Sequence, residues 1–142
     1  MKRIVLWLLA LAILPLGKEA AAQEFQVVVN AANSVSSVGK DELSKIFLKK
    51  ATKWSNGTEA VAVDLKAGEA AREAFSQAVH GRGASAIASF WQQQIFAGKD
   101  VPPEEKGSAA EVIAFVAANP GAVGYVPAGT DVGAGVKVIG VS

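Results

Sequence analysis

The chain of 142 residues contains no cysteine and only one histidine, His80. Without cysteine it has no disulfide framework, thiolate metal site, iron–sulfur cluster or cysteine nucleophile. A single histidine excludes sites built on two imidazoles, so we predict no metal site and no cofactor. The 14 lysines and arginines nearly balance the 13 aspartates and glutamates, which leaves a net charge of +1. Because no strong basic field surrounds such a chain, we expect no nucleic-acid partner.

The N-terminal segment has the pattern of a secretory signal peptide. Met1-Lys2-Arg3 is basic, residues 4–16 form an apolar run, and alanines occupy positions 20–22. The run of about 13 apolar residues is too short for a bilayer core of ~30 Å, which about 20 helical residues span. We therefore expect cleavage after Ala22, a periplasmic or secreted product without a transmembrane segment, and one domain over residues 23–142.

Strand and helix patterns alternate along the rest of the chain. Strands are predicted at 25–29, 60–65, 122–126 and 136–141, and helices from Gly39, over 69–79, from Ser85 to Gly98, and from Ser108 to Asn119. Ser85 and Ser108 are expected to cap their helices, Ser108 together with Glu111 in a capping box. This order favours an α/β fold with a mostly parallel sheet flanked by helices.

No pattern of residues indicates catalysis. Neither a Gly-x-Ser-x-Gly elbow nor a Walker sequence is present. His80 precedes Gly81 at a predicted helix end, where the helix dipole favours a cation, so we interpret it as a structural residue. Glu104 and Glu105 precede a helix, and we interpret them as solvated acids near its start.

The junctions that follow the first two strands, 30–39 and 64–72, are the candidate binding regions, because ligands of such sheets bind at the carboxyl ends of strands. At the second junction Gly68 permits a tight turn, and a helix then opens with free backbone N–H groups. Arg72 in its first turn offers a bidentate fork for phosphate or carboxylate. The alternative interpretation is that Arg72 is a surface residue paired with a neighbouring acid.

Several sequence blocks resemble the phosphate-type substrate-binding proteins of ABC transporters, in the short single-lobed branch of the type 2 periplasmic-binding superfamily. The resemblance covers most of the chain after the signal peptide. It is carried by the blocks 40–48 (KDELSKIFL), 52–57 (TKWSNG), 72–75 (REAF), 90–99 (FWQQQIFAGK) and 120–126 (PGAVGYV). It implies a single lobe of the periplasmic-binding α/β fold, periplasmic residence and a link to phosphate uptake or sensing.

In that family the anion motif is Ser-Gly-Thr-Arg at a helix N-terminus. The matching positions here are Glu69, Ala70, Ala71 and Arg72, so only the arginine is retained. Glu69 places a negative charge where phosphate would approach, a repulsion of roughly 4 kcal/mol at 4 Å and an effective dielectric of 20. In the candidate anion site Arg72 is the clamp, Gly68 allows a close backbone approach, and the amides of Ala70 and Ala71 are donors. Further candidate hydroxyl donors lie in the loop after the first strand: Ser34, Ser36 and Ser37.

Two functions follow from these observations. The first is an exported protein that binds phosphate or a related oxyanion, with an eroded anion motif. The second is a non-catalytic accessory or scaffold protein of the same fold that binds a protein partner in the cell envelope. Nothing in the residues supports an enzyme.

Overall fold

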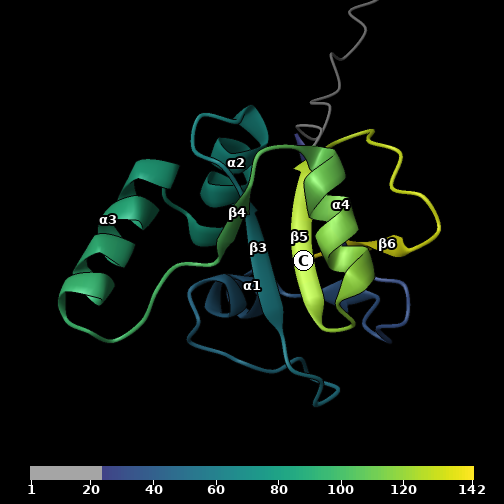
Figure 1. Cartoon of the computed structure of the whole chain (residues 1–142), viewed down its shortest axis with the longest axis horizontal. Coiled ribbons are helices and arrows are strands. Elements are labelled where there is room, and N and C mark those ends of the chain that lie inside the picture. Colours follow the sequence, from purple (N-terminus) through teal and green to yellow (C-terminus); the bar gives the residue numbers. More distant parts are fainter. Residues whose placement is uncertain (1–23) are drawn as a thin grey trace, which may run out of the picture.

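The computed structural model describes residues 24–142, and the predicted signal peptide lies outside them. A six-stranded sheet with helices on both faces forms the body of the domain (Figure 1). The elements in chain order are β1 (Phe25–Asn30), β2 (Ser37–Val38), α1 (Lys40–Phe47), β3 (Val61–Leu65), α2 (Ala70–Phe75), the π-helical turn η1 (Ser76–His80), α3 (Ala84–Phe96), β4 (Glu104–Lys106), α4 (Ala109–Ala118), β5 (Ala122–Pro127) and β6 (Val136–Val141).

The strands lie in the order β2-β6-β1-β5-β3-β4. Strands β3, β4 and β5 run parallel to one another, as do β2 and β6, which confirms the predicted mostly parallel sheet flanked by helices. Strand β1 is antiparallel to both of its neighbours, with Val27 opposite Tyr125 on β5 and Ile139 on β6. The carboxyl end of β1 therefore lies at the end of the sheet opposite to the carboxyl ends of β3 and β5.

The two faces of the sheet bury different layers of the core. On β5, Gly124 and Tyr125 point to opposite faces, as successive strand residues do. A Cβ at Gly124 would meet Val112 of α4, so this glycine lets α4 pack closely on one face. On the other face Tyr125 stacks on Phe75, with ring centroids 4.0 Å apart, and Phe47 packs beside them. Helices α1 and α2 thus cover the face of the sheet to which Tyr125 points.

Short strands and helix ends depart from the prediction. Strands β2 and β4 were not predicted, because β2 has two residues and β4 consists of charged side chains on an edge strand. Gly83, not Ser85, is the N-cap of α3, and the Glu73 carboxylate accepts from the Ala84 amide in place of a serine cap. The predicted cap at Ser108 is confirmed, since its hydroxyl accepts from the Glu111 amide at 3.2 Å.

Within residues 24–142, no helix combines the length and the hydropathy that a membrane crossing requires.

Candidate functional site

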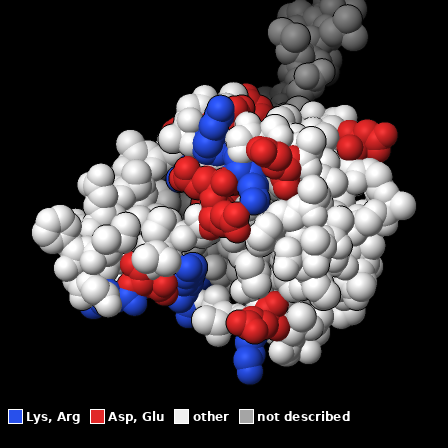
Figure 2. Space-filling view, in the orientation of Figure 1, with Lys and Arg blue, Asp and Glu red and all other residues white. Residues whose placement is uncertain are grey.

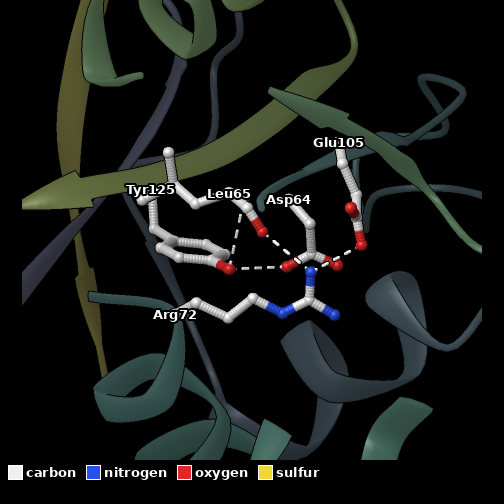
Figure 3. A network of polar contacts seen from close by, with 5 residues as sticks. All are labelled: Asp64, Leu65, Arg72, Glu105 and Tyr125. Atoms are coloured by element: carbon white, nitrogen blue, oxygen red, sulfur yellow. Dashed lines mark hydrogen bonds and ion pairs between the residues drawn. The ribbon is translucent and has the colours of Figure 1, made fainter. Parts of the chain in front are cut away.

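A polar network lies at the carboxyl ends of β3 and β5 and joins four elements (Figure 3). The Tyr125 hydroxyl donates to Asp64 Oδ1 at 2.6 Å and accepts from the Leu65 amide at 3.3 Å. Arg72 Nη1 donates to the Leu65 carbonyl oxygen at 2.8 Å and to Glu105 Oε1 at 2.7 Å. Arg72 is therefore paired with a neighbouring acid, as in the second of the two sequence interpretations, but it is buried, with 8% of its surface exposed.

The local sequence accounts for the position of this arginine. Strand β3 ends at Leu65, and Gly68 takes a positive φ of 94° in the turn that follows. Helix α2 then begins, with Ala71 and Phe75 buried one turn apart. Arg72 follows Ala71 on this inward side, and its side chain reaches back to the end of β3.

Burial and charge act together on the titration of the network. Burial raises the pKa of Asp64, while Arg72 and the hydrogen bond from Tyr125 partly oppose that rise. Burial lowers the pKa of Arg72, but the carboxylates of Asp64 and Glu105 outweigh it, so that this pKa is raised overall. The Tyr125 pKa is also raised, mainly by burial and next by Asp64, which keeps the proton on its hydroxyl. With both acids ionised, two negative charges surround one positive charge.

The free space around Arg72 is small. A cavity of about 10 Å³ lies among Arg72, Ser76, His80 and Tyr125, which is room for about one water molecule and not for a phosphate. A larger groove of about 230 Å³ reaches the guanidinium from the side of α3. Glu105 lines this groove together with Trp91 and Pro102, so its carboxylate lies on the approach to Arg72.

Four of the predicted site residues are brought together at the start of α2. Gly68 forms the turn, Ala70 and Ala71 are the first two residues of the helix, and Arg72 follows. Glu69 is the N-cap, but its side chain makes no capping hydrogen bond. The backbone geometry thus matches the predicted strand–turn–helix junction, although the Ala71 side chain is buried.

The three serines do not join Arg72, which corrects the predicted grouping. The Ser34 hydroxyl accepts from Asn56 Nδ2 at 2.8 Å, in the loops at the other end of the sheet. Ser37 lies in β2, with β6, β1 and β5 between it and β3, and Ser36 immediately precedes it. At a strand spacing of ~4.8 Å this separates β2 from β3 by roughly 19 Å. The serines lie far from Arg72 because β1 runs antiparallel to its neighbours, which places the loop after β1 at the opposite end of the sheet.

Two further interpretations need correction. Glu105 is half exposed to solvent, but it does not lie at a helix start, because it is on β4 and bonds to Arg72. His80 ends a helical segment as predicted, but it does not carry the predicted positive charge. Its pKa is lowered to about 4, mainly by burial and next by Arg82. Its Nδ1 lies 2.7 Å from the Ser44 hydroxyl oxygen, and its ring packs edge-on against Phe75. The histidine is thus a neutral packing residue near neutral pH.

Sequence reasoning missed Asp64, Tyr125 and Glu105 as members of the network. A signal for the first was present, since Asp64 is the one acid in the apolar run Val-Ala-Val-Asp-Leu, and a buried acid requires a partner. No group of three histidine, aspartate or glutamate side chains within residues 24–142 is arranged to hold a metal ion.

Comparison with known proteins identifies the superfamily. A family model described as a PBP superfamily domain matches residues 17–138, most of the chain. No curated protein matches. Among solved structures, a protein from Clostridium perfringens described as a phosphate ABC transporter substrate-binding protein, with bound phosphate, shares 20% sequence identity at a TM-score of 0.64. That alignment covers 83% of this chain and 44% of the other.

Two further structures give the same result. An ABC-type phosphate transport receptor from Vibrio cholerae is 20% identical at a TM-score of 0.64, over 83% of this chain and 46% of its own. PstS from Borrelia burgdorferi is 14% identical at a TM-score of 0.58, over 84% and 47%. The chain spans less than half the length of each of these structures, and the likeness shows a shared fold. The family match establishes that the chain belongs to the PBP superfamily.

Proposed function

We propose that this chain is an exported, non-catalytic binding module of an envelope transport or sensing system, and that it acts by contacting a protein partner. We further propose that its Arg72 position does not capture free phosphate. The observation that argues against phosphate capture is the pairing of Arg72 Nη1 with Leu65 O and Glu105 Oε1, at 2.8 and 2.7 Å. An internal carboxylate already provides the negative charge that a bound oxyanion would provide.

Charge and competition both oppose a free anion at this position. Glu105 already pairs with the charge of Arg72, Asp64 adds a second negative charge when it is ionised, and Glu69 stands at the start of the helix. An oxyanion must displace Glu105, so its apparent affinity falls in proportion to the fraction of molecules in which Glu105 has left.

A second candidate function is oxyanion binding after displacement of Glu105. Two observations favour it: the Glu105 side chain is 47% exposed, and it lies on a three-residue edge strand, so it can leave at low cost. The relative from Clostridium perfringens holds phosphate within the same fold.

Isothermal titration of the purified protein with phosphate and sulfate separates the two functions. We expect no saturable binding to the natural sequence. Micromolar binding of phosphate would contradict the proposal and establish the second function.

A gain-of-function variant tests whether the region at Arg72 is the site of the lost binding. Glu105→Gln releases Arg72, while Glu69→Ser with Ala71→Thr restores the two hydroxyls of the family motif, so the triple variant should bind phosphate. Glu104→Gln in the natural sequence is the matched control, because Glu104 pairs with Lys106 on the same strand at 2.7 Å, and it should gain nothing. A triple variant that folds and binds no phosphate would refute the assigned location.

A further inference from the structure

The carboxyl end of α3 and the turn after it hold a group of apolar side chains in water. Helix α3 stands apart from the sheet at one side of the molecule (Figure 1). Phe96, its last residue, is 96% exposed, and Ile95 and Val101 are 52% and 58% exposed. Three of the five exposed large hydrophobic side chains of residues 24–142 thus lie within seven residues. Apolar side chains gathered in this way mark an interaction surface.

The helix that carries these side chains is fixed to the domain at its inner side. Ile87 and Trp91 pack with Leu48 in a small apolar cluster that also contacts Phe90. Phe96 takes no part in this cluster, and almost its whole side chain stands in water. The phenylalanine therefore projects from an anchored helix.

Lysines lie beside this apolar group. Lys99 follows Phe96 by three residues, in the exposed turn after the helix. Lys50 Nζ lies 5.5 Å from the centroid of the Phe90 ring, so the segment after α1 brings a second lysine to α3. Lys49 precedes it and supplies a third.

A single acid opposes the three lysines. Asp100 Oδ1 lies 3.7 Å from Lys49 Nζ, and no acid occurs from Ala84 to Lys99. Three lysines against one aspartate leave a local net charge of +2. Figure 2 shows charged side chains near the end of α3, whereas the surface over the rest of the helix is uncharged in this view. The exposed apolar group thus lies in a positively charged surface.

We propose that this surface binds the face of an anionic lipid bilayer. We call it the α3 tip and define it by six residues: Lys49, Lys50, Ile95, Phe96, Lys99 and Val101. The apolar side chains enter the headgroup region, and the lysines attract the lipid phosphates. The proposal goes beyond the proposed function and does not depend on a protein partner or on whether Arg72 binds an anion.

Charge and shape together select a lipid surface as the occupant. Aromatic side chains that enter at headgroup level, accompanied by lysines, are the elements of interfacial membrane binding. A projecting side chain such as Phe96 needs a matching pocket in a protein partner, whereas a fluid bilayer yields around it. The local charge of +2 complements anionic headgroups and does not favour a basic partner.

The groove at Arg72 sets the boundary of the α3 tip. Ile95 lines that groove as well, and Glu105 lies on its other wall. Because the Glu105 carboxylate repels anionic lipid, we expect the bilayer to lie against Phe96 and Lys99 and not over the groove. Binding should be reversible and sensitive to salt, since exposed charges are screened over about 8 Å at physiological ionic strength.

Co-sedimentation with lipid vesicles tests the proposal. The protein is taken from residue 23 onward, because the apolar run of residues 4–16 would bind lipid by itself. We expect binding to vesicles of equal parts phosphatidylcholine and phosphatidylglycerol at low salt, loss of binding at high salt, and little binding to pure phosphatidylcholine. Equal binding to both kinds of vesicle would overturn the proposal. Absence of binding to the anionic vesicles would also overturn it and would leave an acidic protein as the occupant to test.

Variants separate the α3 tip from the rest of the surface. Phe96→Ser should weaken binding to the anionic vesicles about tenfold, because it removes a large apolar side chain from the contact. Lys50→Gln combined with Lys99→Gln should weaken it about tenfold at low salt. Val138→Ser combined with Lys137→Gln is the matched control on β6 and should change nothing, since Val138 is 48% exposed. Tip variants that bind as well as the control variant would refute the assigned surface.

A fluorescent label locates the contact independently. Because the chain has no cysteine, Ala97→Cys introduces a unique thiol in an exposed position next to Phe96. A polarity-sensitive dye on this thiol should shift its emission to the blue when anionic vesicles are added. The same dye on Ser37→Cys, exposed on β2, should not shift. Equal shifts at both positions would contradict the orientation. Failure of these experiments would leave the proposed function untouched, because that function is tested by phosphate titration.

Discussion

Replacement of Arg72 by methionine tests the buried network directly. The Arg72 side chain is only 9% exposed. The substitution keeps much of its apolar stem but removes the guanidinium. Glu105 returns to water easily because it is 47% exposed, so the loss falls on Asp64 and the Leu65 carbonyl, which stay buried. Leaving a buried hydrogen-bonding group without its partner costs about 1–3 kcal/mol, and more next to a charge, so we expect about 3 kcal/mol here.

The free energy of unfolding lost on Arg72→Met should increase with pH. In the natural protein the folded-state pKa of Asp64 is raised above its unfolded value of 3.8, so the folded state holds this proton more tightly. Stability then falls as pH rises from the unfolded pKa toward the folded one. Without Arg72 the folded pKa of Asp64 rises further, which extends that fall to higher pH. Arg72→Met should therefore cost more free energy of unfolding at pH 7 than near pH 4.

Urea unfolding of the natural protein and the variant at the two pH values measures both effects. Lys106→Met is the matched control, because Lys106 pairs with Glu104 at the same 2.7 Å on the exposed side of β4 and should cost less than about 1 kcal/mol. Adding Asp64→Asn to Arg72→Met should recover part of the loss at pH 7. A loss below about 1 kcal/mol, or one that does not change with pH, would refute the reasoning.

Three other predictions rest on single residues. The folded-state pKa of His80 is about 4, below the ordinary 6.5, so its contribution to the free energy of unfolding is complete above pH 6.5. That free energy should fall by about 1–2 kcal/mol as the pH drops to 4, allowing for solvent screening. His80→Gln should flatten this part of a urea-unfolding pH series. Tyr125→Phe removes the donor to Asp64 and should lower the free energy of unfolding by about 1–3 kcal/mol at pH 7, measured in urea, whereas an unchanged midpoint would contradict the network. Gly121→Ala places a methyl group against the Glu59 carbonyl oxygen and should lower the thermal midpoint strongly, whereas Gly39→Ala, with no atom within 4 Å, should hardly move it; equal midpoints would contradict the packing.

Much of the fold could be predicted, because apolar periodicity records which side of each element is buried. The long strands and all four α-helices appear near their predicted positions. The short edge strand β4 could not be found in this way. Its Glu-Glu-Lys sequence has no apolar face, and it is a strand because Val63, Asp64 and Leu65 pair with it.

The candidate site was predicted in part. The junction from Gly68 to Arg72 could be read locally, since a strand, a glycine turn and a helix follow in order. Which loop lies opposite that junction depends on strand direction, and the composition of β1 does not reveal that β1 runs antiparallel. The same limit applies to the partner of Arg72, because Glu105 lies 33 residues away and reaches it only through the pairing of β4 with β3.

The most direct test of the central claim is the NMR signal of the Arg72 side-chain N–H groups during a phosphate titration at constant ionic strength. The signal is assigned by its absence in Arg72→Lys. Because Glu105 and the Leu65 carbonyl already bind Arg72 Nη1, we predict that this signal does not change with phosphate. It should shift on the same addition in the triple variant that releases Arg72 and restores the hydroxyls. A saturable shift in the natural protein would contradict the account and show that Arg72 is an anion-binding residue.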